Sequence, residues 1–211
     1  MQLCNSAYGA IHVLRNDNPR GMAICQTGKA PDHDDIMQLA ALLSPGMIAV
    51  DAGANFGCFA LAFAAAGALV YAFEPQPQLA DLLLRSVHLG HADVIVYHAA
   101  LGAQVGEIKM PTVDYTSEMD FGTVRLGAGQ HTVDVMTLDQ LLLPCLDVLK
   151  IDVEGMELEV LRGGEKTIRE YHPVIFVEHH ISGKPALETK LREFGYTQFH
   201  WNERDMLCTR E

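Results

Sequence analysis

One stretch of the chain has the residue types and spacing to hold a nucleoside cofactor: Asp51-Ala52-Gly53-Ala54-Asn55-Phe56-Gly57. It follows a short apolar run, residues 46–50, and precedes an unbroken run of small and apolar residues, 58–66. A strand, a glycine-bearing turn and a helix form the arrangement that brings a nucleoside onto backbone amides. Glycine suits such a turn because it accepts positive φ and lets a ligand approach the backbone. Asparagine is among the few other residues that accept the left-handed region.

An acidic side chain follows at the spacing expected for ribose recognition. Glu74 ends a second strand-like run, residues 69–73, about twenty residues after the glycine turn. A carboxylate in that place can accept hydrogen bonds from ribose hydroxyls. A tight turn without a ligand would also use Gly53 and Gly57, and a solvated strand end would also explain Glu74. The combination of turn and acid favours a cofactor site.

A second group of reactive side chains follows two later apolar runs. Asp152 and Glu154 come after residues 146–151, and His179 and His180 come after residues 174–177. Each of the four is a candidate general base, histidine above all near neutral pH. Carboxylates and imidazoles are also ligands for a divalent cation, but we expect a site that works without a metal. In the plainer interpretations the acids stabilise the following helix dipole and the histidines are exposed loop residues.

The elements that must position these groups alternate between strands and helices, which predicts an α/β fold with a doubly wound, mostly parallel sheet and helices on both faces. The expected strands are residues 46–50, 69–73, 94–98, 146–151, 174–177, 197–201 and 206–209, and the expected helices are residues 34–43, 58–66, 77–89, 156–162, 165–171 and 186–194. In such sheets the ligand crevice lies at the carboxyl ends of the strands. The residues that fall at such ends are Gly57, Glu74, Ala100, Asp152 and His179.

Two segments lie outside this alternation. Extended runs at residues 8–14 and 22–26 flank a segment rich in turn formers, which predicts an N-terminal β-hairpin. Residues 102–131 show little periodicity, with a short strand near 107–110 that we expect to pair with 132–136, before a short helix at 137–142. Because loops on such scaffolds carry specificity, we expect the hairpin and residues 102–131 to form the acceptor pocket.

The bulk composition narrows the possible partners. A chain of 211 residues suits one α/β domain, and its net charge of −12 without a cluster of Lys and Arg argues against nucleic acid. No apolar run approaches membrane-spanning length, and the first ten residues lack the features of a secretory signal. Five scattered cysteines without metal-binding spacing predict free thiols in a reducing cytoplasm. The sequence leaves the oligomeric state open, a homo-oligomer included.

Several motifs occur together in a fixed order: Asp51 to Gly57, Phe73-Glu74-Pro75, Thr137-Leu138-Asp139, Leu149 to Gly155, and a late strand at 175–179. This set resembles the FkbM family of S-adenosylmethionine-dependent methyltransferases, from about residue 34 to the C-terminus. The resemblance implies the Rossmann-like class I methyltransferase fold, a seven-stranded sheet whose last hairpin introduces an antiparallel strand. It also implies methyl transfer, usually to oxygen, on small molecules or glycans.

The resemblance also implies roles for individual residues. Gly53, Ala54 and Gly57 would line the methionine end of the cofactor, with Asp51 shaping the turn. Glu74 would accept from the ribose. The remaining expected cofactor contacts are Asn55, Pro75 beside the adenine, Ala100 and Leu101 at its edge, and Asp152. One departure concerns the helix after Glu74, which carries Ser86-Val87-His88-Leu89 where the family commonly has asparagines.

The sequence therefore predicts one methyltransferase domain, residues 33–211, extended by the hairpin at 1–32. Its cofactor would be S-adenosylmethionine, with S-adenosylhomocysteine as product. The expected acceptor is a hydroxyl on a small molecule or sugar-containing metabolite, as in natural product biosynthesis. The alternatives are N-methylation of a similar acceptor, a non-catalytic protein that binds the cofactor, and a nicotinamide-dependent oxidoreductase. The glycine spacing argues against the last, because it is not G-x-G-x-x-G.

Overall fold

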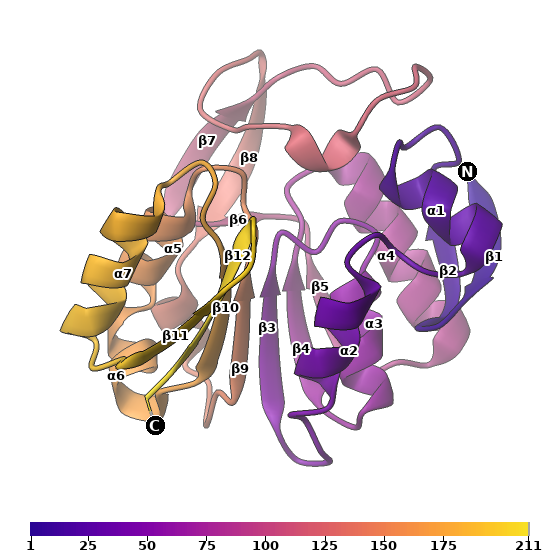
Figure 1. The fold of residues 1–211 in the computed structure, drawn as a ribbon. Coiled ribbons are helices and arrows are strands. Elements are labelled where there is room, and N and C mark those ends of the chain that lie inside the picture. The colour runs from indigo at the N-terminus through magenta and orange to yellow at the C-terminus, as the bar shows by residue number, and fades with distance from the viewer. Residues whose placement is uncertain (211) are drawn as a thin grey trace.

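The computed structural model describes residues 1–210, and a seven-stranded sheet runs through its middle (Figure 1). The strands of this sheet are β3 (Ile48–Ala52), β4 (Leu69–Phe73), β5 (Val94–Tyr97), β9 (Val148–Ile151), β10 (Val174–Glu178), β11 (Gln198–Trp201) and β12 (Asp205–Thr209). Their order is β11-β12-β10-β9-β3-β4-β5. The neighbours from β10 to β5 are parallel, and β12 runs antiparallel to both β10 and β11. The doubly wound sheet with its antiparallel closing hairpin is confirmed.

Helices cover both faces of this sheet, because successive side chains of a buried strand point to opposite faces. Ala49 belongs to one apolar core with α2 (His33–Ala40), α3 (Cys58–Ala65) and α4 (Pro77–Gly90). Val50 belongs to a second core with α5 (Glu157–Gly163), α6 (Glu165–Tyr171) and α7 (Lys184–Glu193). Within residues 1–210, none of the helices is long and apolar enough to cross a membrane.

Most expected elements are confirmed, and one shift matters for the site. Strand β4 has the predicted bounds, whereas β3 begins at Ile48 and ends at Ala52 rather than spanning 46–50. Residues 46 and 47 belong instead to the turn before β3, in which the Met47 amide donates to the Ser44 carbonyl. Asp51 therefore lies within the strand and not in the turn that follows.

The N-terminal hairpin exists with one of its expected strands, at residues 8–14, but the expected strand at 22–26 is wrong. It is formed by β1 (Gln2–Ser6) and β2 (Gly9–Val13), whereas residues 22–26 lie in helix α1 (Arg20–Thr27). The chain turns earlier than predicted because the Ser6 hydroxyl accepts from the Tyr8 amide and donates to the Gly9 carbonyl. Ile24 and Gly21, three residues apart, are the buried positions of α1, which is helical rather than strand spacing.

The hairpin packs on α4 at the position where the sequence departs from the family pattern. Ser86 is fully buried, and its hydroxyl accepts a hydrogen bond of 2.8 Å from the His12 amide in β2. The same hydroxyl donates to the Leu82 carbonyl. A small hydroxyl side chain at this position thus joins the helix to the hairpin.

Residues 102–131 leave the main sheet and form part of a separate small one. Its strands are β6 (Ala100–Leu101), β7 (Gly106–Met110) and β8 (His131–Met136), in the order β6-β8-β7. The expected antiparallel pairing of β7 with β8 is confirmed. The short helix expected at 137–142 is a 3-10 turn, Leu138–Leu141, closed by reciprocal hydrogen bonds between Thr137 and Gln140.

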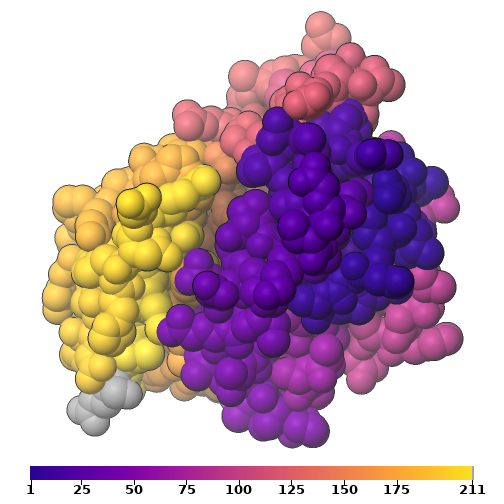
Figure 2. Space-filling model, turned by 45° about the vertical axis from the view of Figure 1, so that its right-hand side comes forward, coloured from indigo at the N-terminus to yellow at the C-terminus, as the bar shows by residue number. Residues whose placement is uncertain are grey.

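The loop between β7 and β8, residues 111–130, crosses the top of the molecule to the N-terminal segment (Figures 1 and 2). The fully buried Asp17 accepts hydrogen bonds from the Phe121 amide at 2.8 Å and from the Gly21 amide at 2.9 Å. Beside it, the Asn18 amide donates to the Met119 carbonyl, and the Met119 amide donates to the Asn16 carbonyl. Asp17 therefore ties the start of α1 to the 111–130 loop.

We expect Asp17→Asn to destabilise the protein by about 2 kcal/mol, because one amide oxygen cannot serve both buried backbone donors. The 111–130 loop should also become more sensitive to limited proteolysis. Urea denaturation and mass spectrometry of the cleavage products measure the two effects. Asp114→Asn is the matched control, since Asp114 is exposed on the same loop. Equal stability and equal cleavage of the two variants would contradict the role of Asp17.

Candidate functional site

A cavity of about 450 Å³ lies at the carboxyl ends of the central parallel strands. Three further parts of the chain complete its wall: the N-terminal segment, the 111–130 loop and the turn between β11 and β12. Polar or charged groups reach it from every part, namely Glu74, Asp152 and Glu178 from the sheet, Arg20, Asp32 and Asp35 from the N-terminal side, Asp120 and Thr123 from the loop, and Arg204 and Asp205 from the last turn. Of the two segments expected to form a pocket, residues 102–131 line this cavity through Asp120 to Leu126, whereas the hairpin β1–β2 contributes no lining residue. The N-terminal wall comes from the start of α1 and from residues 31–35.

The glycine turn at this cavity uses its own backbone amides within the protein. Gly53 and Ala54 both donate to the Phe73 carbonyl at 2.9 Å. The Asn55 amide donates to Glu74 at 2.8 Å, and the Gly57 amide donates to the Ala54 carbonyl. The expectation that these amides would face a ligand is therefore wrong. The turn presents other atoms to the cavity, and its shape is fixed from within.

The two glycines are required by close packing as well as by backbone conformation. Gly53 has φ of 79°, and a Cβ there would lie 1.8 Å from the Asp152 carbonyl oxygen. Gly57 has φ of 90°, and a Cβ there would lie 2.2 Å from a methyl carbon of Leu83. Asn55 adopts the left-handed region, with φ of 53°. The neighbour that excludes a side chain at Gly53 is thus the end of β9.

Glu74 lies buried at the end of β4 and holds the turn in place. One carboxylate oxygen accepts from the Asn55 amide and the other from the Gln76 amide, both at 2.8 Å. Burial raises the pKa of Glu74 to about 7, although both backbone hydrogen bonds favour the charged form. The carboxyl lines the cavity with lone pairs that can still accept from a ligand.

Beneath the turn, a buried ion pair joins the two central strands. Asp51 of β3 and Lys150 of β9 are register partners, and Lys150 Nζ lies 3.0 Å from Asp51 Oδ1. The same ammonium donates to the Gly53 carbonyl at 2.6 Å and lies 3.9 Å from Asp152 Oδ2. Burial lowers the pKa of Lys150, but the carboxyls of Asp51 and Asp152 outweigh it and raise the pKa overall.

The expected cofactor residues divide into two groups. Eight of them line the cavity: Gly53, Ala54, Asn55, Glu74, Pro75, Ala100, Leu101 and Asp152. Asp51 and Gly57 are not part of the lining; Asp51 is fully buried against Lys150, and Gly57 packs on Leu83. These two residues support the turn from behind.

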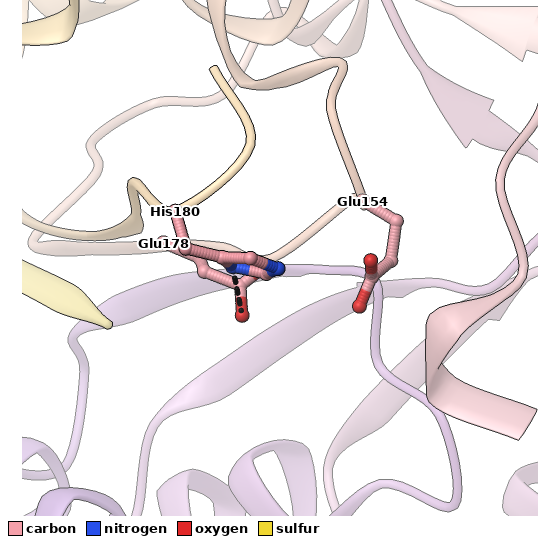
Figure 3. Close-up of side chains that lie close together, drawn as sticks. All are labelled: Glu154, Glu178 and His180. Carbon is pink, nitrogen blue, oxygen red and sulfur yellow. Dashed lines mark ion pairs between the residues drawn. The ribbon is translucent and has the colours of Figure 1, made fainter. Parts of the chain in front are cut away.

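A cluster of acids forms where β9 and β10 end. Asp152, Glu154 and Glu178 line the cavity, and His180 lies beside them (Figure 3). Glu178 Oε1 accepts from Arg204 at 2.8 Å and lies 3.1 Å from His180 Nδ1. Burial and then the charge of Asp152 raise the pKa of Glu154 to about 7 and that of Glu178 to about 9.

The structure does not bring His179 into this cluster. Its ring packs edge-on against Trp201 with centroids 5.7 Å apart, and it is not among the residues that line the cavity. Successive residues of a strand point to opposite faces, so Glu178 reaches the cavity and His179 turns away. Sequence reasoning chose histidine for its pKa and overlooked Glu178, although strand alternation makes only one of the two neighbours available.

Arg20 and Asp32 are a second pair that sequence reasoning missed. Arg20 Nη1 donates to both carboxylate oxygens of Asp32, at 2.8 and 3.0 Å, and both residues line the cavity. The pair was missed because the sequence analysis predicted a strand at 22–26, whereas Arg20 begins helix α1. A basic residue directly after Pro19, at the first turn of a helix, was the available signal.

We expect Lys150→Met to cost about 3–5 kcal/mol of folding stability, because it leaves the Asp51 carboxyl buried without its partner. Asp51→Asn combined with Lys150→Met should recover most of that loss. Urea denaturation of both variants gives the comparison, with Lys166→Met, exposed on α6, as the control. A double variant no more stable than Lys150→Met would show that the ion pair is not the cause.

Comparison with known proteins agrees with this arrangement. The model of the Methyltransferase FkbM domain matches residues 51–197. Hexuronic acid methyltransferase AglP from Haloferax volcanii is 32% identical over 146 residues, which cover 67% of this chain and 59% of that protein. The chain thus spans about three fifths of the length of this relative.

Solved structures share the fold at low sequence identity. Methyltransferase FkbM from Methylobacillus flagellatus superposes with a TM-score of 0.59 at 16% identity, covering 79% of this chain and 44% of that one. Magnesium protoporphyrin IX methyltransferase from Synechocystis, solved with bound S-adenosylmethionine, gives 0.52 at 14% identity, covering 84% and 77%. These structures support the class I methyltransferase fold. With the domain match and the AglP relative, they show that the chain belongs to the FkbM methyltransferase domain family.

Proposed function

We propose that this protein transfers a methyl group from S-adenosylmethionine to a hydroxyl of a sugar-containing small molecule. The observation that carries the proposal is Glu74, a buried carboxyl at the end of β4 that is hydrogen-bonded to the glycine turn and lines the cavity. Membership of the FkbM family supports the reaction type. The cavity of about 450 Å³ is of the size that small-molecule sites have.

The cofactor would lie along the carboxyl ends of β3 and β4. Glu74 would accept from the ribose hydroxyls, and the apolar surface of Pro75 and Leu101 would contact the adenine. The methionine end carries a sulfonium and an ammonium, and acids such as Asp35 and Asp152 around the cavity favour such cations. The rigid turn at Gly53 would place this charged end at the centre of the sheet.

Methyl transfer depends above all on the alignment of the acceptor oxygen, the methyl carbon and the sulfur. The acceptor oxygen attacks the methyl carbon in line with the sulfur, the O–CH₃ bond forms, and the S–CH₃ bond breaks to leave neutral S-adenosylhomocysteine. The hydroxyl proton passes to a nearby base. We assign this role to Asp152, which lines the cavity beside the glycine turn and keeps a partly exposed carboxylate.

The acceptor would enter between the 111–130 loop and the last turn of the chain. These two walls offer Asp120 and Arg204, and the N-terminal wall adds Arg20, a mixture of donors and acceptors that suits a polyhydroxylated molecule. The relative AglP is described as a hexuronic acid methyltransferase, which makes sugar acids the first acceptors to test. Mass spectrometry of products from hydroxyl and amine acceptors would distinguish O- from N-methylation.

We expect S-adenosylmethionine and S-adenosylhomocysteine to raise the melting temperature of the protein, because a ligand that binds only the folded state stabilises it. NAD should leave the melting temperature unchanged, since the turn lacks the dinucleotide glycine spacing. A thermal-shift series at equal ligand concentrations makes the comparison. Stabilisation by NAD alone would refute the proposed cofactor.

Glu74→Gln should weaken S-adenosylhomocysteine binding by about ten- to a hundredfold, since hydrogen bonds to a charged group contribute about 1.5–3 kcal/mol. Isothermal titration calorimetry measures the loss. Glu107→Gln, an exposed acid on β7, is the matched control and should bind like the natural protein. An unchanged affinity in Glu74→Gln would remove Glu74 from the ribose site.

Cofactor affinity should also depend on pH through Glu74. Its pKa is raised to about 7 by burial, and the ribose hydroxyls donate to the ionised form, so binding favours loss of the proton. The ionised fraction falls about tenfold from pH 8 to pH 6, and the dissociation constant for S-adenosylhomocysteine should rise by about the same factor. Calorimetry at the two pH values tests this. The same dependence in Glu74→Gln would assign it to another group.

A further inference from the structure

Three possible metal ligands converge at one side of the cavity. Glu154, Glu178 and His180 each offer one donor atom, and the three atoms lie within 4.8 Å of one another (Figure 3). The backbone positions of Glu154 and Glu178 are set by the strands that lead to them. Glu178 is the last residue of β10, and Glu154 adopts the left-handed region, with φ of 55°, three residues after the end of β9. The convergence therefore follows from the ends of two adjacent strands.

Glu178 has one carboxylate oxygen that nothing in the described part of the chain satisfies. The side chain is 4% exposed, and Oε1 is shared between Arg204 and His180. Oε2 is buried and has no hydrogen-bond partner among residues 1–210. Buried carboxylate oxygens are costly without a partner, which is why they are almost always paired or bound to a metal.

The charges around this oxygen are also unbalanced. Asp152, Glu154 and Glu178 together line one side of the cavity. Among residues 1–210, Arg204 is the cation that forms an ion pair with Glu178. Lys150 lies 3.9 Å from Asp152, but its ammonium is shared with Asp51. Four carboxyls beside two cations leave an excess of negative charge, which a bound cation would offset.

We infer that Glu154, Glu178 and His180 bind a divalent cation of the Mn²⁺ or Mg²⁺ class at the edge of the cavity. Two carboxylates and one imidazole are competent ligands for such an ion. Metal–ligand bonds of about 2.0–2.2 Å place two ligands of one ion at most about 4.4 Å apart. Donor atoms that all lie within 4.8 Å of one another can therefore reach one ion by small side-chain movements.

The role of this ion rests on the proposed methyl transfer. Bound beside Asp152, it would contact the acceptor hydroxyl and make its proton easier to remove. Oε1 of Glu178 would keep Arg204, and His180 would exchange its hydrogen bond to Glu178 for the cation. The ammonium of the cofactor is a competing occupant of the same acids, which the experiment must separate from a metal.

The test is a titration of the metal-stripped protein with MnCl₂, followed by the electron paramagnetic resonance signal of free Mn²⁺, without cofactor. We expect one bound Mn²⁺ per chain, and at least tenfold weaker binding by Glu178→Gln and by His180→Ala. His180→Ala is informative even if Glu178→Gln folds poorly, because His180 is exposed. Glu159→Gln, which changes a partly exposed acid paired with Arg162 on α5, is the control and should bind like the natural protein.

S-adenosylhomocysteine binding, measured on the same samples, separates this inference from the proposed function. Retained cofactor binding in His180→Ala with loss of Mn²⁺ supports a metal site distinct from the cofactor ammonium. Absence of Mn²⁺ and Mg²⁺ binding by the natural protein, or unchanged Mn²⁺ affinity in both variants, overturns the metal site. If cofactor binding is intact in that case, the methyltransferase proposal stands without a metal.

Discussion

The buried ion pair of Asp51 and Lys150 is the interaction on which the geometry of the site depends. It joins β3 to β9 at the centre of the sheet, where parallel pairing already places the two side chains on the same face. Because the same ammonium donates to the Gly53 carbonyl, it also fixes the first residue of the glycine turn. The turn that cradles the proposed cofactor is therefore anchored from below by a charge, and its amides are fully used in holding its own shape.

This anchoring divides the cavity into a rigid side and a covering side. Glu74 and Gly53 belong to the rigid side, where hydrogen bonds within the protein determine each position. The covering side consists of the N-terminal segment and the 111–130 loop, which meet at Asp17. Such a division allows the acceptor pocket to vary while the reaction centre stays the same, because loops can change without disturbing the strand ends.

Local patterns in the sequence predicted the rigid side well. Strand β4, the left-handed Asn55 and the position of Glu74 at the cavity all follow from short-range rules for buried strands and tight turns. The same rules failed where the outcome depended on packing. The spacing of the buried residues identifies α1 as a helix only once its packing against the core is known. Strand β3 begins two residues later than predicted because of the turn before it.

The acids and histidines after β10 show a different limit. Residue type alone favoured His179, but strand alternation points Glu178, and not His179, into the cavity. No local pattern in the sequence reveals that Glu178 is buried. A lysine in a buried strand, such as Lys150, needs a partner, and the register of two strands almost one hundred residues apart supplies Asp51. Long-range register is therefore the information that the sequence interpretation lacked.

The contact between Asp17 and the Phe121 amide spans 104 positions of the chain. During synthesis from the N-terminus, the hairpin and α1 leave the ribosome long before the loop that will cover the cavity. Loop closure over such a separation is entropically costly and comes after local structure has formed. The wall of the binding site is therefore complete only once this long-range contact has formed.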